Sequence, residues 1–267
     1  MSAFAARRRH PLALVVLIAL GLVSTGALYA AIAPRPAAAA SASSDQIAQG
    51  KKLFLANCAT CHGKNAAGSP QSANQRIAGP SLIGVGAASV DFQVSTGRMP
   101  LSAPGPQAPQ GPVLFNTEQI AQMAAYVASL APGPAVPGEE LTSAEGGDIA
   151  NGGAIFRVNC AMCHNFAGAG GALTRGKYAP PIQDVNGRQI YEAMLTGPQA
   201  MPVFNDANIS PENKRDVIAY ALSVQEEAKA GGDTLGNLGP VSEGLFAWVV
   251  GIGALIGCAV WLGAKAA

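Results

Sequence analysis

The chain has 267 residues, a length that allows one or two domains with additional segments. Only 12 % of the residues are charged and the formal net charge is +1, which argues against nucleic acid or a strongly acidic protein as a partner. The 32 glycines and 19 prolines favour loop-rich small domains of the kind that wrap around a cofactor.

The N-terminus combines a basic flank with a long apolar run. Arg7–Arg9 precede an uncharged stretch from Leu12 to Ala33, which is long enough to cross a bilayer as a helix. A secretory signal peptide is the alternative, because small residues from Ala37 to Ala42 could form a cleavage site. We assign residues 1–34 to a transmembrane anchor or signal segment. Both interpretations place the following chain outside the cytoplasm, because Lys/Arg-rich flanks stay inside.

Two copies of a C-x-x-C-H motif follow, Cys58-Ala-Thr-Cys-His62 and Cys160-Ala-Met-Cys-His164. This motif is the attachment site of c-type haem. The two thiols form thioether bonds to the haem vinyl groups, and the adjacent imidazole becomes the proximal iron ligand. The sequence therefore predicts two covalently bound haem c groups, held by Cys58, Cys61 and His62 and by Cys160, Cys163 and His164.

Two other uses of C-x-x-C fit the sequence less well. A thioredoxin-like redox pair would need a βαβ context, and no strand-rich pattern precedes either copy. A four-cysteine zinc site would not explain the histidine after each pair. The two pairs are also 102 residues apart (160 − 58), far beyond the usual spacing of zinc ligands.

The segments around the two motifs are repeats of one another. Between residues 49–62 and 151–164, seven of fourteen positions are identical, including Gly50/Gly152, Phe54/Phe156 and Asn57/Asn159. Each copy is therefore one structural unit, placed at residues 45–131 and 147–229. Each unit is expected to open and close with a helix. The expected N-caps are Ser44 or Asp45 and Asn116 in the first unit and Ser210 in the second, whose first helix is expected to begin at about Asp148.

Segments rich in Pro and Gly connect these parts. Residues 132–146 are predicted to form a semi-rigid linker between the units, and residues 230–243 a linker to the C-terminal segment. An insertion from Leu101 to Pro112 has no counterpart in the second unit. It is either a plain surface loop or a docking loop.

Each haem iron needs a distal ligand. Outside the motifs the only histidine is His10, in the basic N-terminal flank, so methionine is the expected ligand. Met99 and Met201 each lie 37 residues after a proximal histidine (99 − 62 and 201 − 164). Met123 and Met194 fall within expected helices, where they would pack. The predicted iron ligands are therefore His62 with Met99 and His164 with Met201.

Prolines follow each proximal histidine at similar distances, Pro80 in the first unit and Pro180 with Pro181 in the second. A carbonyl at these positions could accept the imidazole N–H and orient the ring, with a plain turn as the alternative. No set of catalytic side chains stands out near either motif, so no catalytic residue is predicted.

A second uncharged run extends from Gly244 to Ala264. Trp248 and Trp261 lie near its ends, as interface anchors do, and Lys265 follows. We predict a transmembrane helix over residues 244–264 with the C-terminus in the cytoplasm. With a retained N-terminal anchor the chain would cross the cell membrane twice, with both haem units on the extracytoplasmic side.

The chain resembles the dihaem cytochrome c subunit of the actinobacterial quinol–cytochrome c reductase, the cytochrome bcc complex. The resemblance covers nearly the whole chain. It rests on the two C-x-x-C-H units, the apolar ends, and three longer strings: Thr96-Gly-Arg-Met-Pro100, Cys160-Ala-Met-Cys-His-Asn-Phe-Ala-Gly-Ala-Gly-Gly171 and Leu173-Thr-Arg-Gly-Lys-Tyr-Ala-Pro180. It implies a mainly α fold of two tandem class I cytochrome c domains, with a C-terminal transmembrane helix and an N-terminal signal-anchor or transmembrane segment.

The resemblance also implies a function. That complex oxidises menaquinol and passes single electrons through a Rieske iron–sulfur centre to this subunit, which hands them to an aa3-type oxidase. The implied partners are the cytochrome b subunit, the Rieske iron–sulfur subunit, the aa3-type cytochrome c oxidase and membrane lipid, with no nucleic acid. The chain would be the electron-transfer subunit of this respiratory enzyme, and the quinol chemistry would lie in its partners.

Two alternatives remain open. A dihaem subunit of a terminal oxidase would also transfer electrons, and would co-purify with the oxidase but without cytochrome b. A dihaem peroxidase would need an open or displaceable iron site, which two complete Met/His pairs do not offer.

Overall fold

The computed structural model describes residues 11–32, 42–69, 79–226 and 240–265. The basic flank Arg7–Arg9, the possible cleavage site before residue 42 and residues 230–239 of the second linker lie outside these ranges. The chain divides into two units, residues 1–41 and residues 42–267, and each is described by itself.

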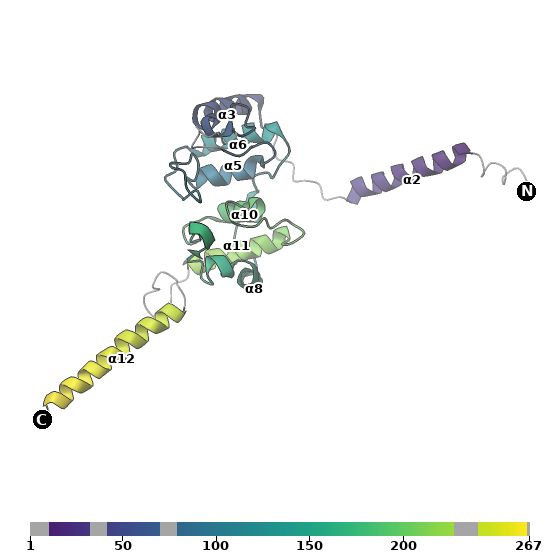
Figure 1. Ribbon diagram of the computed structural model, residues 1–267. Coiled ribbons are helices and arrows are strands. Elements are labelled where there is room, and N and C mark those ends of the chain that lie inside the picture. The colour runs from purple at the N-terminus through teal and green to yellow at the C-terminus, as the bar shows by residue number, and fades with distance from the viewer. Residues whose placement is uncertain (1–10, 33–41, 70–78, 227–239, 266–267) are drawn as a thin grey trace, which may run out of the picture. The chain divides into compact units, whose positions relative to one another are not determined.

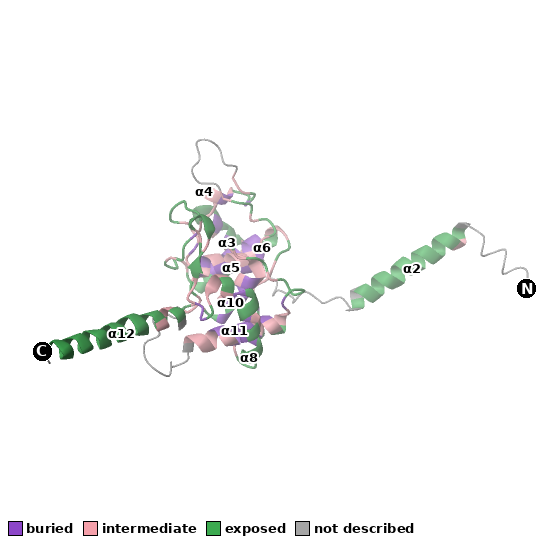
Figure 2. Ribbon diagram, turned by 60° about the horizontal axis from the view of Figure 1, so that its bottom comes forward, coloured by how far each residue is buried: buried purple, intermediate pink, exposed green. Residues whose placement is uncertain are grey.

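The described part of the first unit is one helix, α2 (Pro11–Ile32), of 22 residues. Its span Leu12–Tyr29 has a mean hydropathy of 2.3 and none of it is buried in the protein. Figure 2 shows this helix exposed along its length. An exposed apolar surface of this length is compatible with membrane anchoring, and a signal sequence near an N-terminus has the same properties.

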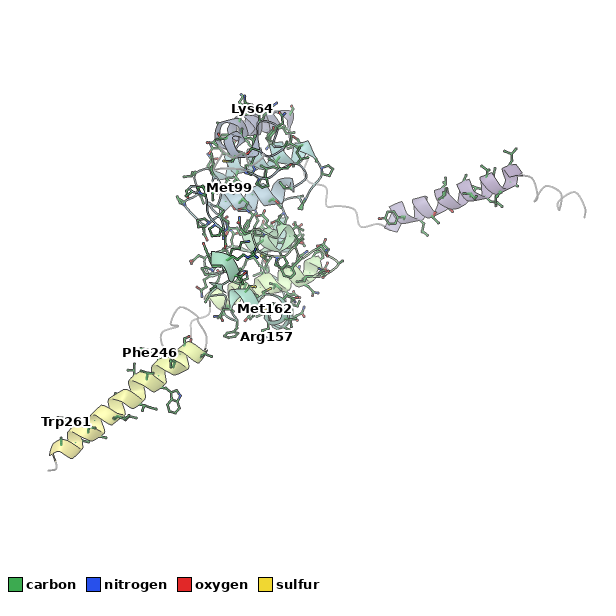
Figure 3. The ribbon with its side chains drawn as sticks, in the orientation of Figure 1. Lys64, Met99, Arg157, Met162, Phe246 and Trp261 are labelled. Carbon is green, nitrogen blue, oxygen red and sulfur yellow. The ribbon has the colours of Figure 1, made fainter. Side chains whose placement is uncertain are left out.

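The C-terminal helix α12 (Pro240–Lys265) has the same character. Its apolar span, Val241–Ala264, has a mean hydropathy of 2.3 and is likewise unburied. The side chains of Phe246 and Trp261 project from it (Figure 3). The helix begins within the predicted second linker, at Pro240, because proline is well tolerated in the first turn of a helix.

The first haem domain is built from α3 (Ser44–Asn57), α4 (Ala59–His62), α5 (Gly86–Ser95) and α6 (Thr117–Leu130). Helix α6 packs against both α3 and α5. Phe54, Ala66, Tyr126 and Val127 form one buried cluster, and Val94, Ile120 and Met123 form another. The burial of Met123 confirms its predicted packing role.

The second haem domain has the same plan with additional short elements. It contains α7 (Glu139–Thr142), α8 (Ile149–Asn159), α9 (Ala161–His164), β1 (Gly171–Ala172), η1 (Thr174–Gly176), β2 (Tyr178–Ala179), α10 (Gly187–Thr196) and α11 (Pro211–Glu226). Strands β1 and β2 pair antiparallel. Helix α11 packs against α8 and α10, and the core includes Phe156, Tyr191, Met194, Val217 and Ile218. Met194 therefore packs as predicted.

Two of the three predicted N-caps are present, and a third cap lies where the first helix of the second unit was expected to begin. Asn116 accepts a hydrogen bond from the Gln119 backbone N–H at 2.9 Å. Asp148 caps α8, and the Ser210 hydroxyl accepts from the Asn213 N–H at 3.3 Å. The first cap was predicted one or two residues late, at Ser44 or Asp45. Ser43 holds that position, because its hydroxyl and the Gln46 side chain form a reciprocal capping box.

Identical residues of the two repeats make matching contacts. The rings of Phe54 and Tyr126 have centroids 5.2 Å apart, and those of Phe156 and Tyr220 are also 5.2 Å apart. Both aromatic pairs join the helix that precedes a C-x-x-C-H motif, α3 or α8, to the last helix of the same domain, α6 or α11. The repeat in sequence is therefore a repeat in packing.

The structure adds three features to the sequence prediction. Each domain has a further helix ahead of its expected distal methionine: α5, which was not predicted, and α10, of which only the part around Met194 was expected to be helical. Helix α7 lies inside the predicted linker 132–146 and packs against α10 and α11. Helices α5 and α10 contact each other and so join the two haem domains (Figure 1).

Candidate haem sites

The first C-x-x-C-H motif is a helical turn at the end of α3. The N–H of Cys58 still bonds to the Phe54 carbonyl at 2.8 Å, and the N–H of His62 bonds to the Cys58 carbonyl at 3.0 Å. The Cys61 N–H reaches the same carbonyl at 3.2 Å. This turn brings both thiols and the imidazole into one short segment, as attachment to a single haem requires.

The second motif repeats this geometry at the end of α8. The N–H groups of Cys163 and His164 bond to the Cys160 carbonyl at 3.1 and 2.9 Å. Cys160 is buried, while Cys163 and His164 are partly exposed. The two sites are thus built in the same way from the two repeats.

Both proximal histidines bond to a proline carbonyl. The distance from His62 Nδ1 to the Pro80 oxygen is 2.8 Å, and that from His164 Nδ1 to the Pro180 oxygen is 2.9 Å. Because a carbonyl only accepts, Nδ1 carries the proton and Nε2 is left as the iron-binding atom. This confirms the predicted support role for Pro80 and Pro180, whereas Pro181 does not make the bond.

A glycine permits this approach in the first domain. A Cβ atom on Gly79 would lie 2.8 Å from His62 Nδ1 and 2.7 Å from the Cys61 carbonyl oxygen. Any side chain there would push the following Pro80 carbonyl away from the imidazole. Gly79 is therefore part of the support for the proximal ring.

Each predicted distal methionine packs against the buried cluster that a cysteine of its own motif contacts or joins. Met99 and Cys58 both contact the cluster of Val94, Ile120 and Met123. The Met99 backbone N–H is held by the Gln93 carbonyl at 2.9 Å, just after α5. In Figure 3, Met99 is labelled on the first domain. The structure thus places Met99 and Cys58 at one cluster, and the coordination of the first iron stays a prediction.

The second domain shows the same arrangement. Met201 packs against the cluster that contains Cys160, and its N–H bonds to the Pro198 carbonyl at 3.0 Å. Met162, inside the motif, is 88 % exposed and is labelled on the second domain in Figure 3. Met201 is therefore better placed than Met162 to face the imidazole.

An open cavity lies beside the second motif. Its volume is about 190 Å³. Its walls combine Cys160, Cys163, His164 and Met201 with apolar residues such as Ile182, Val185, Ile190 and Phe204. Two thiols, an imidazole and a thioether around one apolar space fit a covalently attached haem.

Burial favours the neutral forms of groups in both motifs. Burial, with a smaller contribution from the second thiol of each pair, raises the pKa of Cys58 and of Cys160 to about 11. Burial lowers the pKa of His164, which favours the neutral imidazole that binds iron. Within the described residues no cluster of three or more His, Cys, Asp or Glu is arranged to hold a metal ion.

Residues of the first domain also line the second cavity. Phe92 and Thr96 of the α5 region, Arg98 and Gln107 contribute to its wall. Sequence reasoning had not assigned Arg98 or Gln107 to the second haem. The only local signal was their position, since Arg98 precedes Met99 and Gln107 belongs to the insertion.

The insertion Leu101–Pro112 docks within the chain. The Gln107 side chain donates to the Tyr178 carbonyl at 2.8 Å and accepts from the Tyr178 N–H at 2.9 Å. The Ala108 N–H bonds to the Gln199 side chain at 3.2 Å. Of the two predicted alternatives, the structure thus supports a docking loop, and its target is the second haem domain.

Comparison with known protein families assigns both domains. Residues 47–131 match the family Cytochrome c. Residues 147–220 match the family "Cytochrome C oxidase, cbb3-type, subunit III". Together with the doubled attachment motif, these matches show that the protein carries two covalently bound haem c groups, at Cys58/Cys61 and at Cys160/Cys163.

Curated relatives match nearly the whole chain. The cytochrome bc1 complex cytochrome c subunit of Mycobacterium tuberculosis is 46 % identical, over 97 % of this chain and 93 % of its own length. The subunits of that name from Mycobacterium leprae and Corynebacterium efficiens are 45 % and 43 % identical, over 94 % and 96 % of this chain and 87 % and 90 % of their own lengths. This chain belongs to the family of cytochrome bc1 complex cytochrome c subunits.

Proposed function

We propose that this chain is the dihaem electron-transfer subunit of a menaquinol–cytochrome c reductase in a respiratory chain. It would receive single electrons from a Rieske iron–sulfur centre and deliver them to an aa3-type terminal oxidase. The observation that carries the proposal is the pair of duplicated haem sites in a chain that matches the named relatives over 97 % of its length. When bound, each haem c supplies a one-electron redox centre.

The residues of each site are suited to electron transfer rather than to catalysis on a substrate. The thioether bonds keep the haem attached, and the proline carbonyl fixes the proximal imidazole. With Met99 and Met201 as distal ligands, both axial positions of each iron are filled. A filled coordination sphere leaves no position for peroxide or oxygen, which argues against the peroxidase alternative.

The joined domains support a relay through both sites. Helices α5 and α10 pack together, and the insertion reaches the second domain through Gln107 and Ala108. These contacts hold the two haem sites of one chain as neighbours. A tethered pair of haems would then replace a freely diffusing cytochrome c between the reductase and the oxidase.

Helix α2 precedes the haem domains along the chain and helix α12 follows them. Both helices are apolar, which supports attachment to a membrane. The proposed topology is a cell-membrane protein with both haem domains on the extracytoplasmic side and the C-terminus in the cytoplasm. It rests on Lys265 and Arg7–Arg9 as cytoplasmic flanks. Helix α2 is either a second span or a cleaved signal. A reporter active only outside the cytoplasm should be silent when fused after Ala267.

A subunit of a terminal oxidase is the second candidate. It is favoured by the match of residues 147–220 to the oxidase subunit III family. That match covers one domain only, whereas the relatives named for the bc1 complex cover both domains and both apolar helices. The reductase assignment therefore has the broader support.

Purification of the chain in a mild detergent, followed by identification of its partner chains, tests the proposal. We expect a cytochrome b and a Rieske protein to be recovered, together with an aa3-type oxidase when the supercomplex is preserved. Recovery with the oxidase but without cytochrome b would instead support the second candidate. Binding of carbon monoxide to the reduced, intact protein would count against filled axial positions.

A further inference from the structure

Arg98 lies next to the distal methionine of the first haem and lines the cavity of the second. It follows the end of α5, directly before Met99, and only 5 % of its surface is exposed. Its guanidinium carbon lies 5.4 Å from the centre of the Phe92 ring, and Phe92 lines the same cavity. The guanidinium is thus held at the wall of the second haem site by stacking on a first-domain aromatic ring.

This guanidinium has an unmet hydrogen-bonding requirement. Its Nη1 atom is buried and makes no hydrogen bond, and Arg98 forms no ion pair with any residue that the structure describes. A buried donor that is left unpaired destabilises the protein, and the cost is greater for a charged group. An arginine also stays charged under burial, so it needs an anionic partner rather than loss of its proton.

The geometry points to a haem carboxylate as that partner. A haem carries two propionate groups, and a planar guanidinium binds carboxylates with charge-assisted hydrogen bonds. Of the charged side chains in the described residues, Arg98 is the one in the cavity wall. We infer that Arg98 of the first domain binds a propionate of the haem held by the second domain. The inference rests on the proposed dihaem function and deepens it.

This assignment gives the Arg98–Met99 pair a role at both sites. Met99 is the predicted distal ligand of the first iron, and the preceding residue would bind the second haem. The contacts of Gln107 and Ala108 with the second domain hold the same part of the first domain in place. The two haems would therefore be fixed relative to each other through one short segment of backbone.

The charge of Arg98 should raise the reduction potential of the second haem. A positive charge that neutralises a propionate disfavours the oxidised iron, which carries one more positive charge than the reduced iron. Arg98→Met keeps an apolar stem of similar length and removes the charge. Arg188→Met is the matched control, because Arg188 is exposed on α10 at the domain contact and does not line the cavity.

The test is a redox titration of the purified full-length protein, with the haem content of each variant measured first. The wave that disappears in the Cys160→Ala/Cys163→Ala protein belongs to the second haem. Arg98→Met should lower the midpoint of that wave by at least about threefold in the equilibrium constant, about 30 mV for a one-electron couple. The first-haem wave should move less, and Arg188→Met should leave both waves in place.

The conservative variants separate charge from packing. Arg98→Lys keeps the charge, so the midpoint of its second haem should fall by no more than half as much as in Arg98→Met. Arg98→Gln lacks the charge, so its midpoint should fall as in Arg98→Met. If Arg98→Met does not load two haems, the comparison of Arg98→Lys with Arg98→Gln decides the question. Equal potentials in these two variants, or a first-haem shift as large as the second, would overturn the inference. Failure of the chain to co-purify with cytochrome b would remove the proposed function without changing this titration.

Discussion

Gly152 of α8 lies directly against the backbone of Asp216 in α11, so close that a Cβ atom on the glycine would overlap the Asp216 carbonyl oxygen. Gly50 of α3 has the same relationship to the Gln122 carbonyl of α6. These two glycines occupy equivalent positions in the sequence repeat. The repeat therefore preserves the point at which α3 crosses α6 in the first domain and α8 crosses α11 in the second. Because each motif follows α3 or α8 directly, this crossing sets where the motif lies.

Gly152→Ala should destabilise the second domain by about 1–3 kcal/mol, the usual cost of overpacking a core, because a backbone atom cannot move aside as a side chain can. Gly153→Ala is the matched control on the same helix. Its Cβ would meet the Tyr220 ring edge at 3.0 Å and Arg157 Nη1 at 3.3 Å, and both are side-chain atoms that can shift. Denaturant unfolding followed by haem absorbance measures both. Equal stability of the two variants would show that the helices do not cross as closely as described.

Met99→His and Met201→His test the distal ligands. Each variant should keep its haem attached through the thioether bonds, and should lower the reduction potential of that haem, because methionine ligation raises it. The measurement is a redox titration with each substitution in turn. Met123→Leu serves as the control, since Met123 is buried in the core. An unchanged titration after Met99→His would remove Met99 from the predicted ligand set.

Glu192 of α10 is a buried acid at the contact between the domains. Its side chain is 0 % exposed and lies near Asp91 of α5. Burial raises its pKa to about 9, with a further contribution from Asp91 of α5 and an opposing one from Arg188. The folded protein therefore keeps a proton on Glu192 that the unfolded chain loses near pH 4.5.

The stability of the folded protein depends on pH because Glu192 binds its proton more tightly in the folded than in the unfolded state. Below about pH 4.5 Glu192 is protonated in both states. As the pH rises from there towards 9, the unfolded chain binds fewer protons than the folded protein, so the stability falls. Glu192→Gln should remove this fall and raise the melting temperature at pH 8.5 by several degrees, on the order of 2–4 °C per kcal/mol. At pH 5 its effect should be small.

Thermal melts of wild type and Glu192→Gln from pH 5 to 9 make the comparison. Glu145→Gln is the control, because Glu145 is exposed. Haem propionates titrate in all three proteins, so only the difference between curves reports on Glu192. Parallel curves for Glu192→Gln and wild type would mean that the acid is not buried as described.

Local sequence was sufficient for the parts of the fold that local chemistry determines. The C-x-x-C-H spacing, the Asn116 and Ser210 caps and the Pro80 and Pro180 carbonyls all depend on residues near one another in the chain. The repeat then extended each assignment to the second domain. The equal distance from proximal histidine to methionine supplied the candidate distal ligands in the same way.

The contact between the domains could not be predicted from the sequence. The sequence does not distinguish Glu192 from an exposed glutamate of a helix, because its burial depends on contact with α5. It does not distinguish Arg98 from a surface arginine either, because the burial of Arg98 depends on the second domain, whose cavity it lines. Such burial depends on the packing of distant segments, which no local pattern records. The insertion was recognised as an extra segment, but its partner Tyr178 lies 71 residues from Gln107.

The final prediction concerns the reason for two haems in one chain. If one site were a spare carrier, its loss would reduce quinol-dependent oxygen uptake only modestly. If the sites act in series, loss of either one should abolish it. Both domains have a full set of candidate ligands, and the contacts of α5 with α10 keep them together, which favours the series arrangement.

Replacing both cysteines of one motif by alanine, first Cys58 with Cys61 and then Cys160 with Cys163, tests this arrangement. Assembly of each variant with its partner chains has to be verified first, because a complex that fails to form would also lose activity. Oxygen uptake with a quinol substrate is then compared with that of Cys258→Ala, which lies in α12 outside both motifs and should retain full activity. We expect loss of nearly all uptake in both double variants. Substantial uptake with either haem absent would exclude the series arrangement, while the assignment to electron transfer would stand.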